Sequence, residues 1–367
     1  MTPEELRADI PALEEVVYLN TGAGSPSPRR VVEAIEDTAR YQEYDAPAGE
    51  GTYGALFESL ETAREAVAGH LGAAAEDVAL TQSTADGISR LVAAMDWESG
   101  DVVVRTDQEH PAGILPFESL RRRHDVEVRV VDAHGGAIDR DEWKSAVADA
   151  KLAVFSSLCW TDGCRLPVAE LTDIAHDAGA RVLVDAVQSV GQRPVDVEDW
   201  GADAVAGAGH KWLLGPTGAG FLHVDSEFAR TLSPAQVGYM SVTDTEADPF
   251  ELKPDARRFE VGSVSPLPYA GLREGIATIE EVGYDTITDR IERLTGRLKE
   301  GLGDRLVSTR EYQSGLVTFE DDDPEATVER LSEAGVKVRD IPPKGTVRAS
   351  VHVFNSEDDV DALLDAL

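Results

Sequence analysis

Short apolar runs alternate with longer amphipathic stretches from about residue 77 to residue 208. Runs that are rich in Val and Ala and bounded by Gly, Pro or charged residues are typical of strands buried on both faces. Such runs occupy residues 78–81, 101–105, 126–131, 152–159, 182–187 and 203–208. The stretches between them, such as 168–179, have the amphipathic pattern of helices. This alternation predicts a parallel sheet with helices on both faces.

The pattern changes outside this region. Residues 218–224 predict a strand that follows the previous one by a turn too short for a crossover, so we expect it to pair antiparallel. A short helix at 4–15 and a strand at 16–19 are expected near the N-terminus. Toward the C-terminus the expected helices are 268–302, 324–334 and 356–364, and the expected strands are 316–319, 336–339 and 346–353.

Together these elements predict an α/β fold of two domains. Residues 16–255 are expected to form a large domain around a mostly parallel seven-stranded sheet. Residues 1–15 and 256–367 are expected to form a small α+β domain.

Polar residues follow the two strands expected at 182–187 and 203–208. Asp185 and Gln188 come at the end of the first strand, and His210 and Lys211 come directly after the second. Ligands of open α/β sheets bind outside the carboxyl ends of the strands, so we expect these side chains to meet at one edge. Taken singly, each has a plainer interpretation: Asp185 as a loop cap, and Lys211 as a solvated amine.

The combination of an acid, an amide and an amine at this edge indicates pyridoxal phosphate. An amine such as that of Lys211 forms a Schiff base with an aldehyde when its surroundings lower its pKa. A carboxylate such as that of Asp185 keeps a pyridinium nitrogen protonated, which makes the ring an electron sink. The amide of Gln188 can donate a hydrogen bond to the ring oxygen.

The segments DAVQSVGQRPVDV, from Asp185, and AGAGHKWLLGPTGAGFL, around Lys211, resemble the signature of class V, fold-type I pyridoxal-phosphate enzymes. These include cysteine desulfurases, selenocysteine lyases, isopenicillin-N-epimerase-like proteins, kynureninases and small-amino-acid aminotransferases. The resemblance implies the fold-type I transferase fold and a homodimer with its active site at the subunit interface. It also implies a small-molecule substrate, an amino acid, whose α-proton Lys211 moves.

The turn after the strand at 78–81 carries Ser83, Thr84 and Ala85 at the start of a helix. Free backbone N–H groups at a helix start bind anions, and the resemblance implies that this turn holds the cofactor phosphate. Simple helix capping by Ser83 or Thr84 is the alternative. The resemblance further implies that the hydroxyl of Ser263 reaches the phosphate of the neighbouring subunit. Many family members carry a hydroxyl three residues before the lysine, where this chain has Ala208, so we expect the phosphate to rely on His210, Ser263 and backbone amides instead.

Further segments resemble the family at the ring and substrate positions. His110 follows the strand at 101–105, where the family has a histidine stacked on the pyridine face. Arg348 lies in TVRASVHVFN, which resembles the family motif whose arginine grips the substrate carboxylate, a bidentate task that suits guanidinium. Asn20, Thr21 and Trp160 lie in segments that border the family's substrate site, although the first two also fit a plain turn.

The two cysteines, Cys159 and Cys164, give no disulfide framework and no zinc-ligand spacing, so no metal is expected. Desulfurases carry a loop cysteine shortly before the carboxylate arginine, and the segment VRDIPPKG has none here. We expect Cys164 to be the more exposed of the two. An aminotransferase or epimerase-like activity therefore ranks first. Cysteine desulfurase or selenocysteine lyase is the alternative, and a non-catalytic protein that keeps the fold comes last.

The net charge of −35 comes from acidic residues spread along the chain. Such a surface repels nucleic acid. It suits a protein that works in high salt, where self-repulsion is screened, although an ordinary acidic enzyme is the alternative. The N-terminus lacks the apolar core of a signal peptide, and no apolar run approaches the length of a membrane span. A cytoplasmic protein that does not bind membranes is expected.

Overall fold

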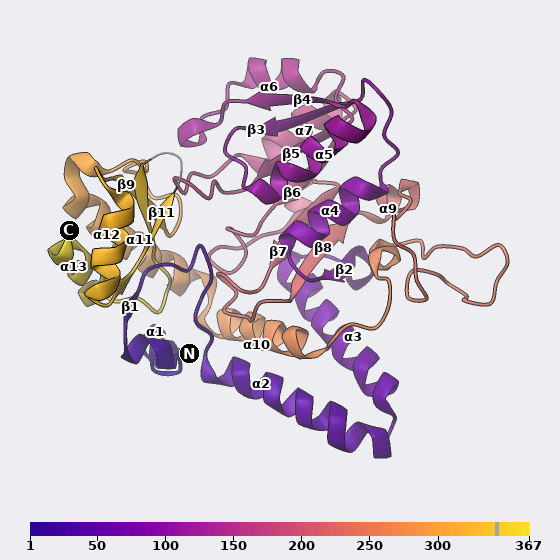
Figure 1. Cartoon of the computed structure of the whole chain (residues 1–367), viewed down its shortest axis with the longest axis horizontal. Coiled ribbons are helices and arrows are strands. Elements are labelled where there is room, and N and C mark those ends of the chain that lie inside the picture. Colours follow the sequence, from indigo (N-terminus) through magenta and orange to yellow (C-terminus); the bar gives the residue numbers. More distant parts are fainter. Residues whose placement is uncertain (342–344) are drawn as a thin grey trace.

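The computed structural model describes residues 1–341 and 345–367 and contains the expected seven-stranded sheet (Figure 1). The strand order is β2-β8-β7-β6-β5-β3-β4, and β8 runs antiparallel to both of its neighbours while the other neighbours pair in parallel. The strands are β2 (Val78–Thr81), β3 (Val102–Thr106), β4 (Glu127–Val131), β5 (Leu152–Ser156), β6 (Arg181–Asp185), β7 (Ala204–Ala208) and β8 (Gly220–Val224). The predicted fold class and the antiparallel β8 are confirmed.

Alternate residues of the central strands enter two separate cores, one on each face of the sheet. In β6, Val182 and Val184 belong to one core and Leu183 to the other. Helices on both faces bury these side chains, which is why the runs read as continuously apolar. The helices of the large part of the chain are α2 (Arg29–Arg40), α3 (Thr52–Leu71), α4 (Thr84–Ala94), α5 (Leu115–His124), α6 (Arg140–Val147), α7 (Val168–Asp177), α8 (Val197–Trp200), α9 (Ser226–Thr231) and α10 (Leu267–Val282).

The C-terminal region forms a three-stranded antiparallel sheet in the order β11-β12-β9, covered by helices (Figure 1). Its elements are α11 (Tyr284–Leu302), β9 (Leu316–Glu320), α12 (Pro324–Glu333), β10 (Val336–Lys337), β11 (Arg339–Ile341), β12 (Thr346–Ser350) and α13 (Glu357–Ala366). The single helix expected at 268–302 is wrong, because Gly283, at φ 83°, separates α10 from α11. That conformation favours glycine and ends a helix.

The N-terminal segment lies against this C-terminal region. Helix α1 (Pro3–Ala8) ends early, and a 3₁₀ turn beginning at Pro11 replaces the rest of the helix expected at 4–15. Strand β1 (Val17–Tyr18) pairs in parallel with β10. The predicted domain boundaries at residues 15 and 255 stay a prediction. Strand β1 was assigned to the large domain, but its pairing partner β10 belongs to the C-terminal region.

Short helical turns complete the chain. They are Pro11–Glu14, Ala46–Ala48, Ala75–Asp77, Pro111–Gly113, His134–Gly136, Ala256–Phe259 and Gly303–Arg305, with a π-turn at Tyr41–Asp45. No helix of the described residues has both the length and the apolar character needed to cross a membrane.

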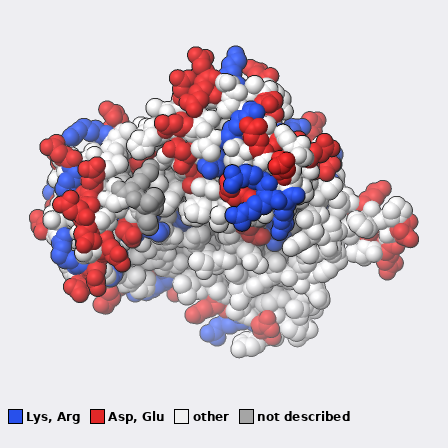
Figure 2. All heavy atoms as spheres, turned by 45° about the horizontal axis from the view of Figure 1, so that its top comes forward, with Lys and Arg blue, Asp and Glu red and all other residues white. Residues whose placement is uncertain are grey.

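Carboxylates are spread over several elements of the face seen in Figure 2 and outnumber the basic side chains there. With 69 acidic and 34 basic residues in the chain, most carboxylates have no cation to pair with. We expect the melting temperature to rise by at least about 5 °C when KCl is raised from about 0.1 M to about 2 M, because salt screens this repulsion. Thermal unfolding followed by circular dichroism measures it. A melting temperature indifferent to KCl, or one that sucrose at equal osmolality raises as much, would contradict the screening explanation.

Candidate active site

Lys211 and Asp185 meet at the carboxyl edge of the sheet. Asp185 is the last residue of β6 and stands opposite Ala206 of β7, and Lys211 follows the end of β7 by three residues. Burial lowers the pKa of Lys211 to about 8, an effect that Asp185 opposes and Arg348 strengthens. Burial also raises the pKa of Asp185, while the Val187 N–H at 2.9 Å and Lys211 act in the other direction. A lysine with such a pKa is partly unprotonated near neutrality, as a nucleophile or a base must be.

A cavity of about 200 Å³ opens beside Lys211 and is lined by residues from several distant segments. Nine of the predicted site residues line it: Ser83, Thr84, Ala85, His110, Trp160, Asp185, Gln188, His210 and Lys211. The chain thus brings together strand ends and helix starts that lie more than a hundred residues apart in sequence.

The turn at the start of α4 contributes both a cap and a free hydroxyl. The Ser83 hydroxyl accepts a hydrogen bond from the Asp86 N–H at 3.1 Å, so capping, the plainer interpretation, holds for this residue. The Thr84 hydroxyl is buried without a partner among the described residues. Gly220 of β8 lets this turn approach, since a Cβ there would lie 2.7 Å from the Ser83 backbone. A free hydroxyl beside the unpaired N–H groups of a helix start suits an anion.

His110 and Trp160 form one wall of the cavity. Their ring centroids are 5.3 Å apart at an interplanar angle of 83°, an edge-to-face contact. Burial and the cations Lys211, Arg339 and Arg348 lower the pKa of His110, so the ring is neutral near pH 7. The His110 Nδ1 accepts from the Ala112 N–H at 3.2 Å, which fixes the ring's orientation.

Arg348 lies fully buried in β12, and two of its three guanidinium nitrogens are unpaired. Its Nη1 donates to the Trp160 carbonyl at 2.6 Å, but Nε and Nη2 have no partner among the described residues. Burial lowers its pKa to about 9. Gly22 is required beside it, because a Cβ there would lie 2.9 Å from Nη2. Buried donors without partners are costly, so this guanidinium fits a carboxylate ligand.

Asn20 and Thr21 lie in the same loop as Gly22 and are also only partly satisfied. The Asn20 Oδ1 and the Thr21 hydroxyl are buried without partners among the described residues, as is the hydroxyl of Ser350, which forms a β-bridge with Asn20. Unpaired polar atoms in the Gly22 loop and in β12, which carries Arg348, indicate a polar ligand at this position.

Gln188 differs from the expected arrangement. Its Nε2 donates to the Gly22 carbonyl at 2.9 Å, and its Oε1 accepts from the Trp212 indole at 2.8 Å. Only one amide N–H is therefore left for a ring oxygen. The first role of this side chain is to tie the Gly22 loop to the segment that carries Lys211.

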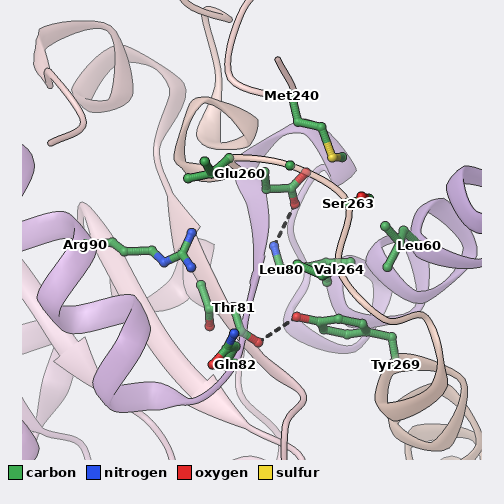
Figure 3. A pocket seen from close by; sticks show the side chains of 12 residues that line it. Leu60, Leu80, Thr81, Gln82, Arg90, Met240, Glu260, Ser263, Val264 and Tyr269 are labelled. Atoms are coloured by element: carbon green, nitrogen blue, oxygen red, sulfur yellow. Dashed lines mark hydrogen bonds between the residues drawn. The ribbon is translucent and has the colours of Figure 1, made fainter. Parts of the chain in front are cut away.

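Ser263 lies outside the Lys211 cavity. It lines a separate cavity of about 280 Å³ together with Arg90, Met240, Glu260 and Tyr269 (Figure 3). Its backbone N–H donates to the Tyr239 hydroxyl at 2.6 Å. Its expected contact with a phosphate of the neighbouring subunit stays a prediction.

The sequence interpretation missed Arg339 and Glu109. Arg339 of β11 stands opposite Arg348 of β12 and lines the Lys211 cavity. Glu109 is buried and accepts hydrogen bonds from Thr106 and from Ser156, which joins the ends of β3 and β5. Burial raises the pKa of Glu109 to about 7. The available signal for Arg339 was its place at the end of the strand expected at 336–339.

Cys164 was expected to be the more exposed of the two cysteines, but at 1% against 0% for Cys159 the difference is negligible and both thiols are buried. Burial raises the pKa of both thiols, that of Cys164 to about 12. The segment expected to carry a desulfurase cysteine falls partly on residues 342–344, which lie outside the described residues. Across the described residues, no cluster of three or more His, Cys, Asp or Glu side chains could hold a metal ion.

Comparisons with known proteins find relatives and solved structures that match this chain over nearly its whole length. A probable cysteine desulfurase of Methanothermobacter thermautotrophicus is 33% identical and aligns over 100% of this chain and 98% of its own. An apo cysteine desulfurase structure from Thermococcus onnurineus NA1 has a TM-score of 0.92 at 29% identity, covering 100% of this chain and 97% of that one. The cystine C–S lyase C-DES, in complex with its product cysteine persulfide, has a TM-score of 0.90 at 26% identity, covering 97% of this chain and 98% of that one. The model of the class-V aminotransferase family matches residues 17–363, and the chain therefore belongs to that family.

Proposed function

We propose that this protein is a pyridoxal-phosphate-dependent lyase that cleaves the C–S bond of cysteine or cystine and releases the sulfur without passing it to a thiol of its own. The sequence alone favoured transamination or epimerisation over C–S cleavage. The relatives named cysteine desulfurase and cystine C–S lyase favour C–S cleavage. The observation that carries the proposal is a buried Arg348 with two unpartnered nitrogens, suited to a carboxylate, combined with two buried cysteines.

The expected cofactor, pyridoxal phosphate, is the one used by this family and is confirmed. The residues present fit it. The free Thr84 hydroxyl and the start of α4 would hold the phosphate, Asp185 the ring nitrogen, and His110 the ring face, with Lys211 at the aldehyde. When bound, this group supplies an electron sink for the charge that develops at the substrate Cα.

The protein's own groups bind, orient and deprotonate the substrate. The unpaired Nε and Nη2 of Arg348 offer two parallel donors to the α-carboxylate. The Lys211 amine, with its pKa near 8, takes the proton from Cα. The edge-to-face contact between His110 and Trp160 fixes the position of the imidazole ring that would face the cofactor.

Elimination then needs no oxidant and no enzyme thiol. The electron pair of the Cα–H bond forms a Cα–Cβ double bond, and the Cβ–S pair leaves with the sulfur. Hydrolysis of the resulting enamine gives pyruvate and ammonia. Cysteine would release sulfide, and cystine would release cysteine persulfide, the product bound in the related C–S lyase.

The double variant Cys159→Ala, Cys164→Ala is expected to form pyruvate and sulfide from cysteine within about twofold of the wild-type rate. A nucleophilic thiolate needs exposure and a lowered pKa, and both thiols here are buried with raised pKa values. Product assays with cysteine and cystine measure this, with melting temperature as the check on folding.

Two outcomes would contradict the proposal. Alanine formation with a persulfide on the enzyme, lost in Cys164→Ala but kept in Cys159→Ala, would establish a desulfurase instead. Keto-acid formation that requires an added amino-group acceptor would establish transamination.

A further inference from the structure

A second polar cavity, of about 390 Å³, lies behind the strand ends that carry the Lys211 site. It is lined by Arg140, Ser157, Arg165, Ser189, Arg193 and Gln313, with an apolar wall that includes Trp200. It shares no lining residue with the Lys211 cavity. Ser189 nevertheless follows Gln188 directly, so the two cavities are neighbours across one turn.

The positive charge in this cavity is not balanced. Arg140 is neutralised by Glu170, whose two oxygens accept from it at 2.7 Å each. Arg165 and Arg193 form no ion pair and no side-chain hydrogen bond with any described residue, and no described carboxylate lines the cavity. In a chain with 69 acidic and 34 basic residues, two unpaired arginines in one cavity call for a separate explanation.

The two guanidinium groups repel each other. Burial and the nearby charge of Arg165 together lower the pKa of Arg193 to about 10, an effect that Tyr312 opposes. Like charges held together without a counter-ion are destabilising. An anion bound between them would attract both guanidinium groups and so offset this repulsion.

The remaining polar side chains of the cavity can each donate a hydrogen bond as well as accept one. The hydroxyls of Ser157 and Ser189 lie 2.7 Å apart, and Ser157 can also donate to the Asp185 carbonyl at 3.2 Å. The amide of Gln313 faces the cavity from the C-terminal region and has no hydrogen bond to the described residues. Two guanidinium groups with hydroxyl and amide donors match the several oxygens of a tetrahedral oxyanion.

We propose that this cavity binds a small oxyanion of the phosphate or sulfate class between Arg165 and Arg193. The surrounding surface excludes polyanions, because the chain's net charge of −35 repels them, whereas a single small ion enters under screening. The proposal is independent of the reaction at Lys211.

Isothermal titration of the holoenzyme with sodium sulfate, and separately with sodium phosphate, tests this at a constant KCl concentration. The holoenzyme is used because the cofactor's own phosphate then occupies its site. We expect one ion per chain to bind to the wild type, with affinity at least tenfold weaker in Arg193→Gln and in Arg165→Gln. The ion that binds more tightly identifies the ligand.

Arg122→Gln is the matched control, because Arg122 is exposed on α5 and lines neither cavity. It removes the same charge and should leave the affinity unchanged. Arg165 is exposed, so its variant remains informative if Arg193→Gln fails to fold. Binding that is equally tight in the wild type and in both variants, or no binding beyond that of chloride, would overturn the proposal.

Discussion

Replacing Lys211 with alanine is expected to lower turnover by about 10³-fold to 10⁴-fold, because it removes the base that moves the α-proton and the amine that holds the cofactor. Steady-state assays of pyruvate formation measure the loss. Borohydride treatment followed by peptide mass spectrometry should place the cofactor label on the peptide that contains Lys211 in the wild type. A label on another lysine, or turnover within tenfold of the wild type, would refute this assignment.

The pH dependence of cofactor attachment distinguishes a reactive Lys211 from a lysine with only a structural role. The pKa of Lys211 is lowered to about 8, so its amine is mostly protonated below that pH and free above it. The rate at which the apoprotein acquires the cofactor should therefore rise about tenfold per pH unit below pH 8 and level off above it. A rate that keeps rising toward pH 10 would show that burial does not lower this pKa.

Arg348 is the second position where a large effect is expected. Arg348→Gln should lower kcat/KM by about 10²-fold to 10³-fold, and Arg348→Lys should recover little of it, because a single ammonium cannot replace two parallel donors. The cofactor spectrum should be unchanged, since the lost contact is to the substrate carboxylate. Kinetics with cysteine and cystine measure the loss, and Arg122→Gln is the surface control.

Thermal stability separates this substrate role from a structural one. Arg348 is a buried cation with two unpaired donor nitrogens, and it gains one hydrogen bond, to the Trp160 carbonyl. Replacing such a group with an apolar side chain of similar size is often neutral or stabilising. We expect Arg348→Met to melt at or above the wild-type temperature while losing activity. A large fall in melting temperature would show that the arginine holds the fold.

Much of the fold could be predicted from the sequence because its signals are local. Buried strands such as β6 and β7 read as short apolar runs, and their neighbours along the chain are their neighbours in the sheet. The rule that ligands bind at the carboxyl ends of parallel strands then placed Asp185 and Lys211 at one edge. The Gly-rich turn after Lys211 also predicted the antiparallel β8.

The tertiary structure alone decided how those side chains are used. The side-chain amide of Gln188 forms hydrogen bonds with Gly22 and Trp212, which lie 166 and 24 residues away in the sequence. Cys164 follows a strand in a polar-looking turn, yet the packing of the chain buries it.

Arg339 reaches the Lys211 cavity only because β11 pairs with β12 in a register that no local pattern encodes. Periodicity determines which face of an element is buried, whereas the partner of a polar side chain depends on contacts between distant segments. The sequence by itself thus determined the sheet, the lysine and the aspartate, and the tertiary structure decided which donors remain free for a ligand.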